Sequence, residues 1–164
     1  MHRRIEGISE FEKKGKQFNF KRPTAVMKPG NEIELRCFPG FDYVFHYAGI
    51  VASHYQSLGH PLRVTYTTPE KRMCRHALEA SGIFTIPVAR VVIMGYVEGL
   101  DSRSPDAKWR GNGEFKWKRF DSTIPDSILV GCEHTYWGDI AGTVVELFAE
   151  RGVQLVIYAG KLGS

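Results

Sequence analysis

Four adjacent residues with reactive side chains, Cys132-Glu133-His134-Thr135, form the part of this sequence best suited to chemistry. His134 is a candidate general acid or base, because an unperturbed imidazole titrates near neutral pH. Glu133 is a candidate partner for sugar hydroxyls or for a nitrogen that carries a proton, and the Cys132 thiol would gain thiolate character beside a helix N-terminus. The structural alternative is a capping threonine, a core cysteine and a surface histidine. We predict Glu133 and His134 as catalytic residues and Thr135 as a substrate contact.

A second candidate site is the glycine-rich run that follows the last apolar segment, Gly160-Lys161-Leu162-Gly163-Ser164. Glycine lets the backbone approach a bound anion, backbone N–H groups can cradle a phosphate, and Lys161 adds a positive charge. The run matches neither the Walker A pattern nor the dinucleotide-binding fingerprint, and an ordinary glycine turn is the alternative. The residues predicted to contact substrate, in addition to Thr135, are Gly131, Gly160, Lys161, Gly163 and Ser164.

Both candidate runs follow segments with the pattern of buried strands. Residues 127–131 and residues 153–159 are apolar, and residues 139–151 between them have the spacing of an amphipathic helix. A strand–helix–strand unit requires a crossover connection, so we expect the two strands to be parallel. Ligands of open parallel sheets bind beyond the carboxyl ends of the strands, which is where both candidate runs lie.

The rest of the chain alternates between strand and helix patterns. It predicts strands over residues 33–37, 62–66, 86–97 and 115–120, and helices over residues 42–58 and 69–82. This order is typical of a layered α/β fold with a mixed, mostly parallel sheet flanked by helices. Within it, residues 91–94 should be a central strand because they are apolar on both faces, and the run of consecutive strands implies an antiparallel hairpin.

The composition is that of an ordinary globular chain. Its 164 residues are 43% hydrophobic and 24% charged, which suits a single domain and argues against disorder. No apolar run is long enough to cross a bilayer, and no signal peptide is recognisable. The three cysteines are widely spaced and odd in number, which favours reduced thiols and a cytoplasmic location. We predict no metal site, because His46 and His54 lack both the short helical spacing and a carboxylate partner.

Residues 1–28 are predicted to form a basic N-terminal arm, with residues 29–164 as a single α/β domain. Basic residues in the arm alternate with Phe11, Phe18 and Phe20, and this combination could bind a nucleic-acid backbone and stack on bases. The reading that we favour is an arm whose phenylalanines dock on the domain.

The C-terminal third resembles the nucleoside phosphorylase and nucleosidase superfamily. The resemblance rests on a strand ending in glycine at residues 128–131, a helix over residues 139–150, the Arg151-Gly152-Val153 turn, and a strand that leads into the Gly160–Gly163 loop. It departs from that family where Cys132-Glu133-His134 replaces a second glycine. The family's later half has no counterpart here, so we expect the domain to be incomplete at its C-terminus.

The resemblance implies a domain that binds a nucleoside or nucleotide and cleaves an N-glycosidic bond, with phosphate or water as the acceptor. Phosphate would then be a co-substrate, and no other cofactor is expected. A partner chain, in a homo-oligomer or otherwise, would supply what this domain lacks. Two alternatives stay open: a non-catalytic protein-interaction module, and a nucleic-acid-binding domain that uses the basic arm.

Overall fold

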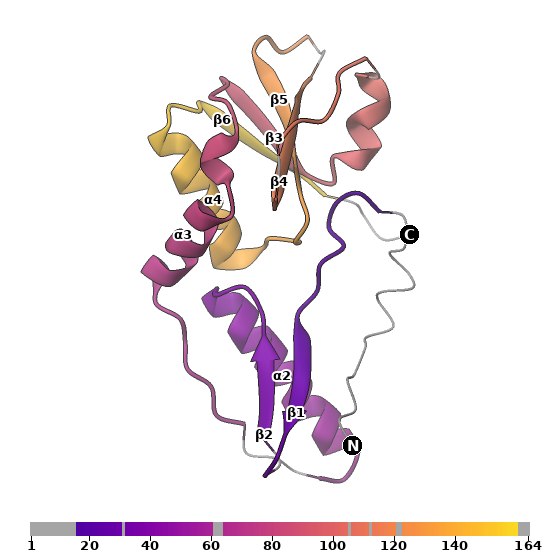
Figure 1. The fold of residues 1–164 in the computed structure, drawn as a ribbon, viewed down its shortest axis with the longest axis vertical. Coiled ribbons are helices and arrows are strands. Elements are labelled where there is room, and N and C mark those ends of the chain that lie inside the picture. Colours follow the sequence, from indigo (N-terminus) through magenta and orange to yellow (C-terminus); the bar gives the residue numbers. More distant parts are fainter. Residues whose placement is uncertain are drawn as a thin grey trace.

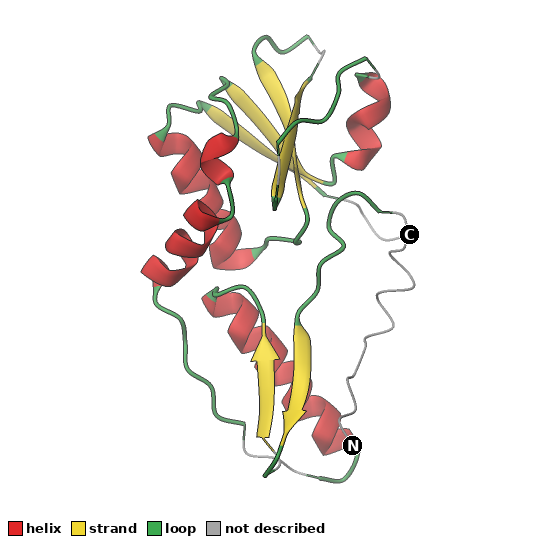
Figure 2. Cartoon of the chain, in the orientation of Figure 1, coloured by secondary structure: helices red, strands yellow, loops and turns green. Residues whose placement is uncertain are grey.

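The computed structural model describes residues 16–30, 32–60, 64–104, 106–111, 113–120 and 123–160. Figure 1 shows a four-stranded sheet with helices beside it, and below it a second, two-stranded sheet that lies against one long helix. Helices and strands are combined in both parts (Figure 2). The α/β class predicted from the sequence is confirmed.

The larger sheet is built from β3 (Val91–Gly95), β4 (Phe115–Arg119), β5 (Ser127–Cys132) and β6 (Leu155–Ala159), in the order β4-β5-β3-β6. Strands β5 and β6 run parallel to β3, and β4 is antiparallel to β5. The sheet is therefore mixed and mostly parallel, as predicted. All five residues of β3 are buried, because its apolar side chains are covered on both faces of the sheet.

Helices α3 (Lys71–Ala80) and α4 (Gly138–Glu150) pack on one face of this sheet. Their buried residues join those of alternate strand positions in one core, which includes Leu78, Val92, Met94, Ile128, Val130, Ile140, Val144, Leu147 and Phe148. The opposite face is covered by Phe18, by Trp109 and by the short helix η2 (Glu98–Arg103). The β5-α4-β6 unit is thus the expected crossover, although β3 lies between its two strands.

The smaller sheet pairs β1 (Thr24–Lys28) with β2 (Glu32–Arg36) beside helix α2 (Phe41–Ser57). Residues 24–28, which the sequence pattern placed in the arm, therefore form a strand. Aspartates at the starts of α2 and α4 join this part to the rest. The Asp139 carboxylate accepts hydrogen bonds from the backbone N–H groups of Phe41 (2.8 Å) and Asp42 (3.1 Å), and the Asp42 carboxylate accepts one from the N–H of Asp139 (2.8 Å).

Two predicted elements differ in the structure. Residues 64–70 have no regular structure where a strand was expected over 62–66, and residues 61–63 lie outside the described part. A β-branched run becomes a strand only if another strand pairs with it, and none of the described residues does so here. Strand β3 is shorter than the predicted strand over residues 86–97, because residues 86–90, which follow helix η1 (Ile83–Thr85), and residues 96–97 are not paired in the sheet. None of the described helices is both long enough and apolar enough to span a membrane.

Residues 17–21 cross the carboxyl ends of β5 and β3. The Asn19 N–H donates to the Cys132 carbonyl (2.8 Å), and the Asn19 side-chain amide donates to the Gly95 carbonyl (3.2 Å). The Phe18 ring, only 1% exposed, packs edge-on against Trp109 and over Gly131, where a side chain would collide with it. The N-terminal segment therefore packs on the sheet through Phe18. It covers the carboxyl ends of β5 and β3.

This packing predicts opposite effects for two glycine-to-alanine changes. A Cβ added at Gly131 would lie 2.3–2.5 Å from atoms of the Phe18 ring. Gly131→Ala should lower the free energy of unfolding by about 1–3 kcal/mol, because the ring has to shift. Gly142→Ala in α4 meets nothing within 4 Å and should raise it by about 0.5–1 kcal/mol. Urea denaturation measures both, and equal effects would contradict the docking of Phe18 on β5.

Candidate functional site

The end of β5 brings together most of the residues predicted from the sequence. Gly131 lies within β5, and Glu133, His134 and Thr135 follow it directly. Gly160 follows β6, on the far side of β3. Lys161, Gly163 and Ser164 lie outside the described residues, so their predicted substrate contacts stay predictions.

A buried carboxylate, that of Glu114, organises the residues after β5. Glu114 is 6% exposed and lies opposite Glu133, because it precedes β4, in which Phe115 pairs with Cys132 of β5. One carboxylate oxygen accepts the backbone N–H of His134 (2.6 Å), and the other lies 2.8 Å from His134 Nδ1 and 3.4 Å from Lys21 Nζ. Burial opposes ionisation of Glu114, but the bonds from His134 outweigh it and hold the pKa of this carboxyl below its usual value.

Lys21 links the N-terminal segment to the same cluster. Its ammonium lies 2.5 Å from the Glu133 carboxylate, and its backbone N–H donates to the Glu133 carbonyl (3.0 Å). The hydrogen bond to Glu133 raises the pKa of Lys21 despite partial burial. Since the Lys21 side chain is 44% exposed, solvent screens this pair, and its main effect is to hold the Glu133 carboxylate in place.

Aromatic rings enclose the His134 imidazole. It is stacked on Tyr136 with ring centroids 5.9 Å apart, and Phe38 is placed edge-on to both rings. The Tyr136 hydroxyl is buried and has no hydrogen-bond partner among the described residues, and both burial and the Glu114 carboxylate raise its pKa. Tyr136 therefore stays neutral and contributes a wall to the site.

The geometry equips His134 for proton transfer. Nδ1 lies 2.8 Å from the Glu114 carboxylate, at ion-pair distance, and Nε2 is left for a reacting atom. No described residue is bonded to Nε2, and a quarter of the side chain is exposed. A carboxylate beside one ring nitrogen is a feature that this pair shares with general-base histidines in unrelated enzymes.

The expected thiolate character of Cys132 is wrong. The Cys132 side chain is buried in the core, and helix α4 begins only at Gly138. Burial, with a further contribution from the Glu114 carboxylate, raises the pKa of the thiol strongly. Cys132 is a neutral core residue and cannot act as a nucleophile at neutral pH.

The remaining predicted contacts have separate roles. Thr135 accepts a hydrogen bond from Arg22 at its hydroxyl (3.1 Å) and one from the Tyr43 hydroxyl at its carbonyl. The space in front of Gly131 is filled by Phe18, whereas Gly160 is exposed and open on the side where a Cβ would lie. Among the described residues, no group of three metal-binding side chains comes together.

Sequence reasoning missed Glu114 and Lys21. Glu114 was detectable, since pairing the predicted strand at 115–120 with the strand at 127–131 in a hairpin places residue 114 near residue 133. Lys21 was seen only as part of a basic arm, because nothing in a single sequence shows where such a segment docks.

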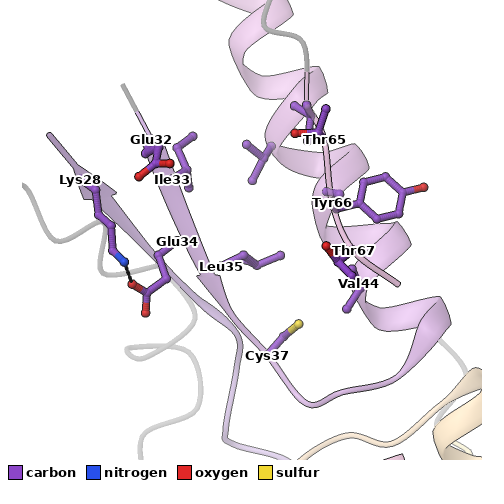
Figure 3. A pocket seen from close by; sticks show the side chains of 13 residues that line it. Lys28, Glu32, Ile33, Glu34, Leu35, Cys37, Val44, Thr65, Tyr66 and Thr67 are labelled. Carbon is purple, nitrogen blue, oxygen red and sulfur yellow. Dashed lines mark ion pairs between the residues drawn. The ribbon is translucent and has the colours of Figure 1, made fainter. Parts of the chain in front are cut away.

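A cavity of about 570 Å³ lies away from this cluster, between β2, α2 and residues 64–67 (Figure 3). Its walls are mainly apolar, from Ile33, Leu35, Val44, Ala48, Val51 and Val64. Lys28 and Glu34 form an ion pair at one rim, and Glu34 also pairs with Arg36 (2.5 Å). Glu32, Cys37 and Tyr66 also line the cavity, but no histidine lies among its described lining residues.

Comparison with known proteins finds one distant similarity. Over 168 aligned residues it is 27% identical to a protein of Cordyceps militaris named Oxidoreductase cns1. The match covers 91% of this chain and 21% of that protein, so the chain spans about a fifth of the length of its relative. No protein-family model matches the chain, and no solved structure matches it.

The buried carboxylate predicts a specific sensitivity to acid. Because the pKa of Glu114 is held below its reference value of 4.5, the stabilisation it supplies is complete above that pH and is lost as the pH falls through the lowered pKa. The free energy of unfolding should therefore fall as the pH drops below about 4.5, and Glu114→Gln should flatten this part of the curve. At pH 7 the same change should cost about 1–3 kcal/mol.

Glu146→Gln is the matched control, since the Glu146 carboxylate is half-exposed and paired with Lys71 on the helix surface. Urea denaturation across this pH range compares the two variants with the wild type. A Glu114→Gln curve that runs parallel to the wild-type curve would show that the ionised Glu114 does not stabilise the fold.

Proposed function

We propose that this chain is an α/β domain that binds a nucleoside or nucleotide beside the end of β5, and that His134 transfers a proton to or from the ligand. The observation that carries the proposal is the position of the His134 imidazole beside the buried Glu114 carboxylate, which lies 2.8 Å from Nδ1. Because residues 17–21 fill the edge between β5 and β3, the ligand approaches His134 from its exposed side.

Each group has a role in this proposal. For cleavage of an N-glycosidic bond, protonated His134 gives its Nε2 proton to a ring nitrogen of the departing base, and Glu114 steadies the charged imidazole. The Glu133 carboxylate accepts hydrogen bonds from sugar hydroxyls while Lys21 holds it in place. The aromatic rings of Phe38 and Tyr136 limit the access of water to the imidazole.

A second candidate function follows from the relative named as an oxidoreductase. Oxidation of an alcohol requires a base for the hydroxyl proton, and the same pair of His134 and Glu114 can accept it. In that case the domain contributes the proton acceptor, and a hydride acceptor bound elsewhere in a longer protein takes the electrons. The dinucleotide fingerprint is absent from this sequence, which favours the first candidate for the domain itself.

We place the protein in the cytoplasm, because its three cysteines are free thiols and two of them, Cys74 and Cys132, are buried without a disulfide partner. A reducing compartment is where such thiols persist.

The test measures ligand binding through the change in melting temperature on thermal denaturation. A nucleoside or nucleotide that binds the folded state must raise the melting temperature by mass action, and a ligand at a hundred times its Kd adds about 2.7 kcal/mol. His134→Gln should then abolish base release from any bound nucleoside, measured by chromatography, while leaving most of the thermal shift in place.

His54→Gln is the matched control, because His54 is an exposed histidine on α2. Full activity in His134→Gln would remove the proton-transfer role. If millimolar nucleosides, nucleotides and free bases all left the melting temperature unchanged, nucleoside binding would be contradicted, and a protein-interaction module or an incomplete domain would be favoured.

A further inference from the structure

The N-terminal segment carries an arginine that no acidic residue neutralises among the described residues. The Arg22 guanidinium is half-buried, and Nη1 donates to the Thr135 hydroxyl (3.1 Å) and to the Lys21 carbonyl (2.8 Å). Within the described part of the chain, no carboxylate lies within ion-pairing distance of Arg22, and no group accepts from its Nε or Nη2. Three of the five guanidinium N–H donors therefore have no acceptor in this part of the protein.

A second half-buried arginine, Arg151, shows how a structural arginine uses the hydrogen-bond donors of its guanidinium. Arg151 also has no carboxylate partner among the described residues, but it donates from Nη1 to the Ile83 carbonyl (3.2 Å) and from Nη2 to the Ile86 carbonyl (2.6 Å). Its plane also lies over the Phe84 ring. Both Nη1 and Nη2 of Arg151 therefore donate hydrogen bonds, whereas only Nη1 of Arg22 donates to a described residue.

Thr135, which contacts Arg22, is joined to two tyrosines of α2. Tyr43 donates to the Thr135 carbonyl, and one helical turn further along α2 the Tyr47 ring lies edge-on to Tyr43 with centroids 5.6 Å apart. The Tyr47 hydroxyl has no hydrogen-bond partner among the described residues. Burial raises the pKa of Tyr43 and of Tyr47, Arg22 opposes that shift at both, and no carboxylate of the described residues acts on either.

From these contacts we infer that Arg22, Thr135 and Tyr47 form a binding site for a phosphate group, between the segment that precedes β1, helix α2 and the segment that follows β5. The Arg22 fork can bind two oxygens of an oxyanion. The Thr135 hydroxyl accepts from Arg22, so its own proton is available to a ligand, and the Tyr47 hydroxyl is a further donor. Donors on three different elements suit a tetrahedral phosphate better than a flat carboxylate.

This site is separate from the phosphate contacts predicted at the glycine-rich end of the chain. It also differs from the start of α4, where the Asp42 carboxylate already occupies the place of an anion. The inference does not rest on the proposed nucleoside chemistry: phosphate binding at Arg22 would stand even if His134 transferred no proton.

Titration with inorganic phosphate tests the site, by isothermal calorimetry at constant ionic strength with chloride as the replaced anion. The wild-type chain should bind phosphate more tightly than acetate. Arg22→Gln should weaken phosphate binding about tenfold or more, and Tyr47→Phe by a smaller factor of about three to ten. Arg72→Gln, which removes an exposed arginine paired with Glu70, should leave binding unchanged.

Three results would overturn the inference: no heat of phosphate binding to the wild type, equal affinity in Arg22→Gln, or equal weakening in Arg72→Gln. Tyr47→Phe keeps the test valid if Arg22→Gln fails to fold, since the hydroxyl of Tyr47 has no described partner to lose. His134→Gln should bind phosphate like the wild type, which separates failure of this site from failure of the proposed proton transfer. A sugar phosphate that binds more tightly than free phosphate would identify an organic phosphate as the ligand.

Discussion

The buried carboxylate of Glu114 is the interaction on which the arrangement at the end of β5 depends. It accepts a hydrogen bond from the backbone N–H of His134 and lies at ion-pair distance from the His134 ring and from the ammonium of Lys21, so it joins the start of β4, the end of β5 and the N-terminal segment. A carboxylate this deeply buried is tolerated only when its partners are in place. The same partners that make the buried charge acceptable also orient the imidazole for chemistry.

The N-terminal segment is part of the sheet architecture. Asn19 and Lys21 extend the hydrogen bonding of β5 by one more segment, and Phe18 fills the space that a side chain at Gly131 would need. In most open parallel sheets, ligands bind at the carboxyl ends of the strands. Here the chain itself occupies this position, and the reactive groups are displaced to the side of β5 that faces Phe38.

The two aspartates that bind each other's helix start explain how the smaller sheet is attached. Asp42 and Asp139 each place a carboxylate at the N-terminus of the other's helix, where the helix dipole and unpaired N–H groups favour a negative charge. Gly138 leaves room for this contact, since a Cβ there would lie 2.2 Å from the Asp42 carboxylate. The junction also brings Tyr43 of α2 to the Thr135 carbonyl, with the Tyr47 ring edge-on to Tyr43, so a capping interaction positions part of a candidate site.

The sequence by itself determined the α/β class, the central position of residues 91–94, the crossover through α4 and the gathering of Glu133 and His134 at a strand end. These follow from local periodicity and from the chain order of strands and helices, which a single sequence displays. Tertiary structure alone decided that Glu114 and Lys21 complete the cluster, that Cys132 is inert, that residues 24–28 pair as a strand and that residues 64–70 do not. Each of these depends on which distant segment of the chain lies alongside. Burial sets the pKa of a thiol, and the neighbouring segment decides which group a carboxylate bonds to and whether an apolar run pairs as a strand.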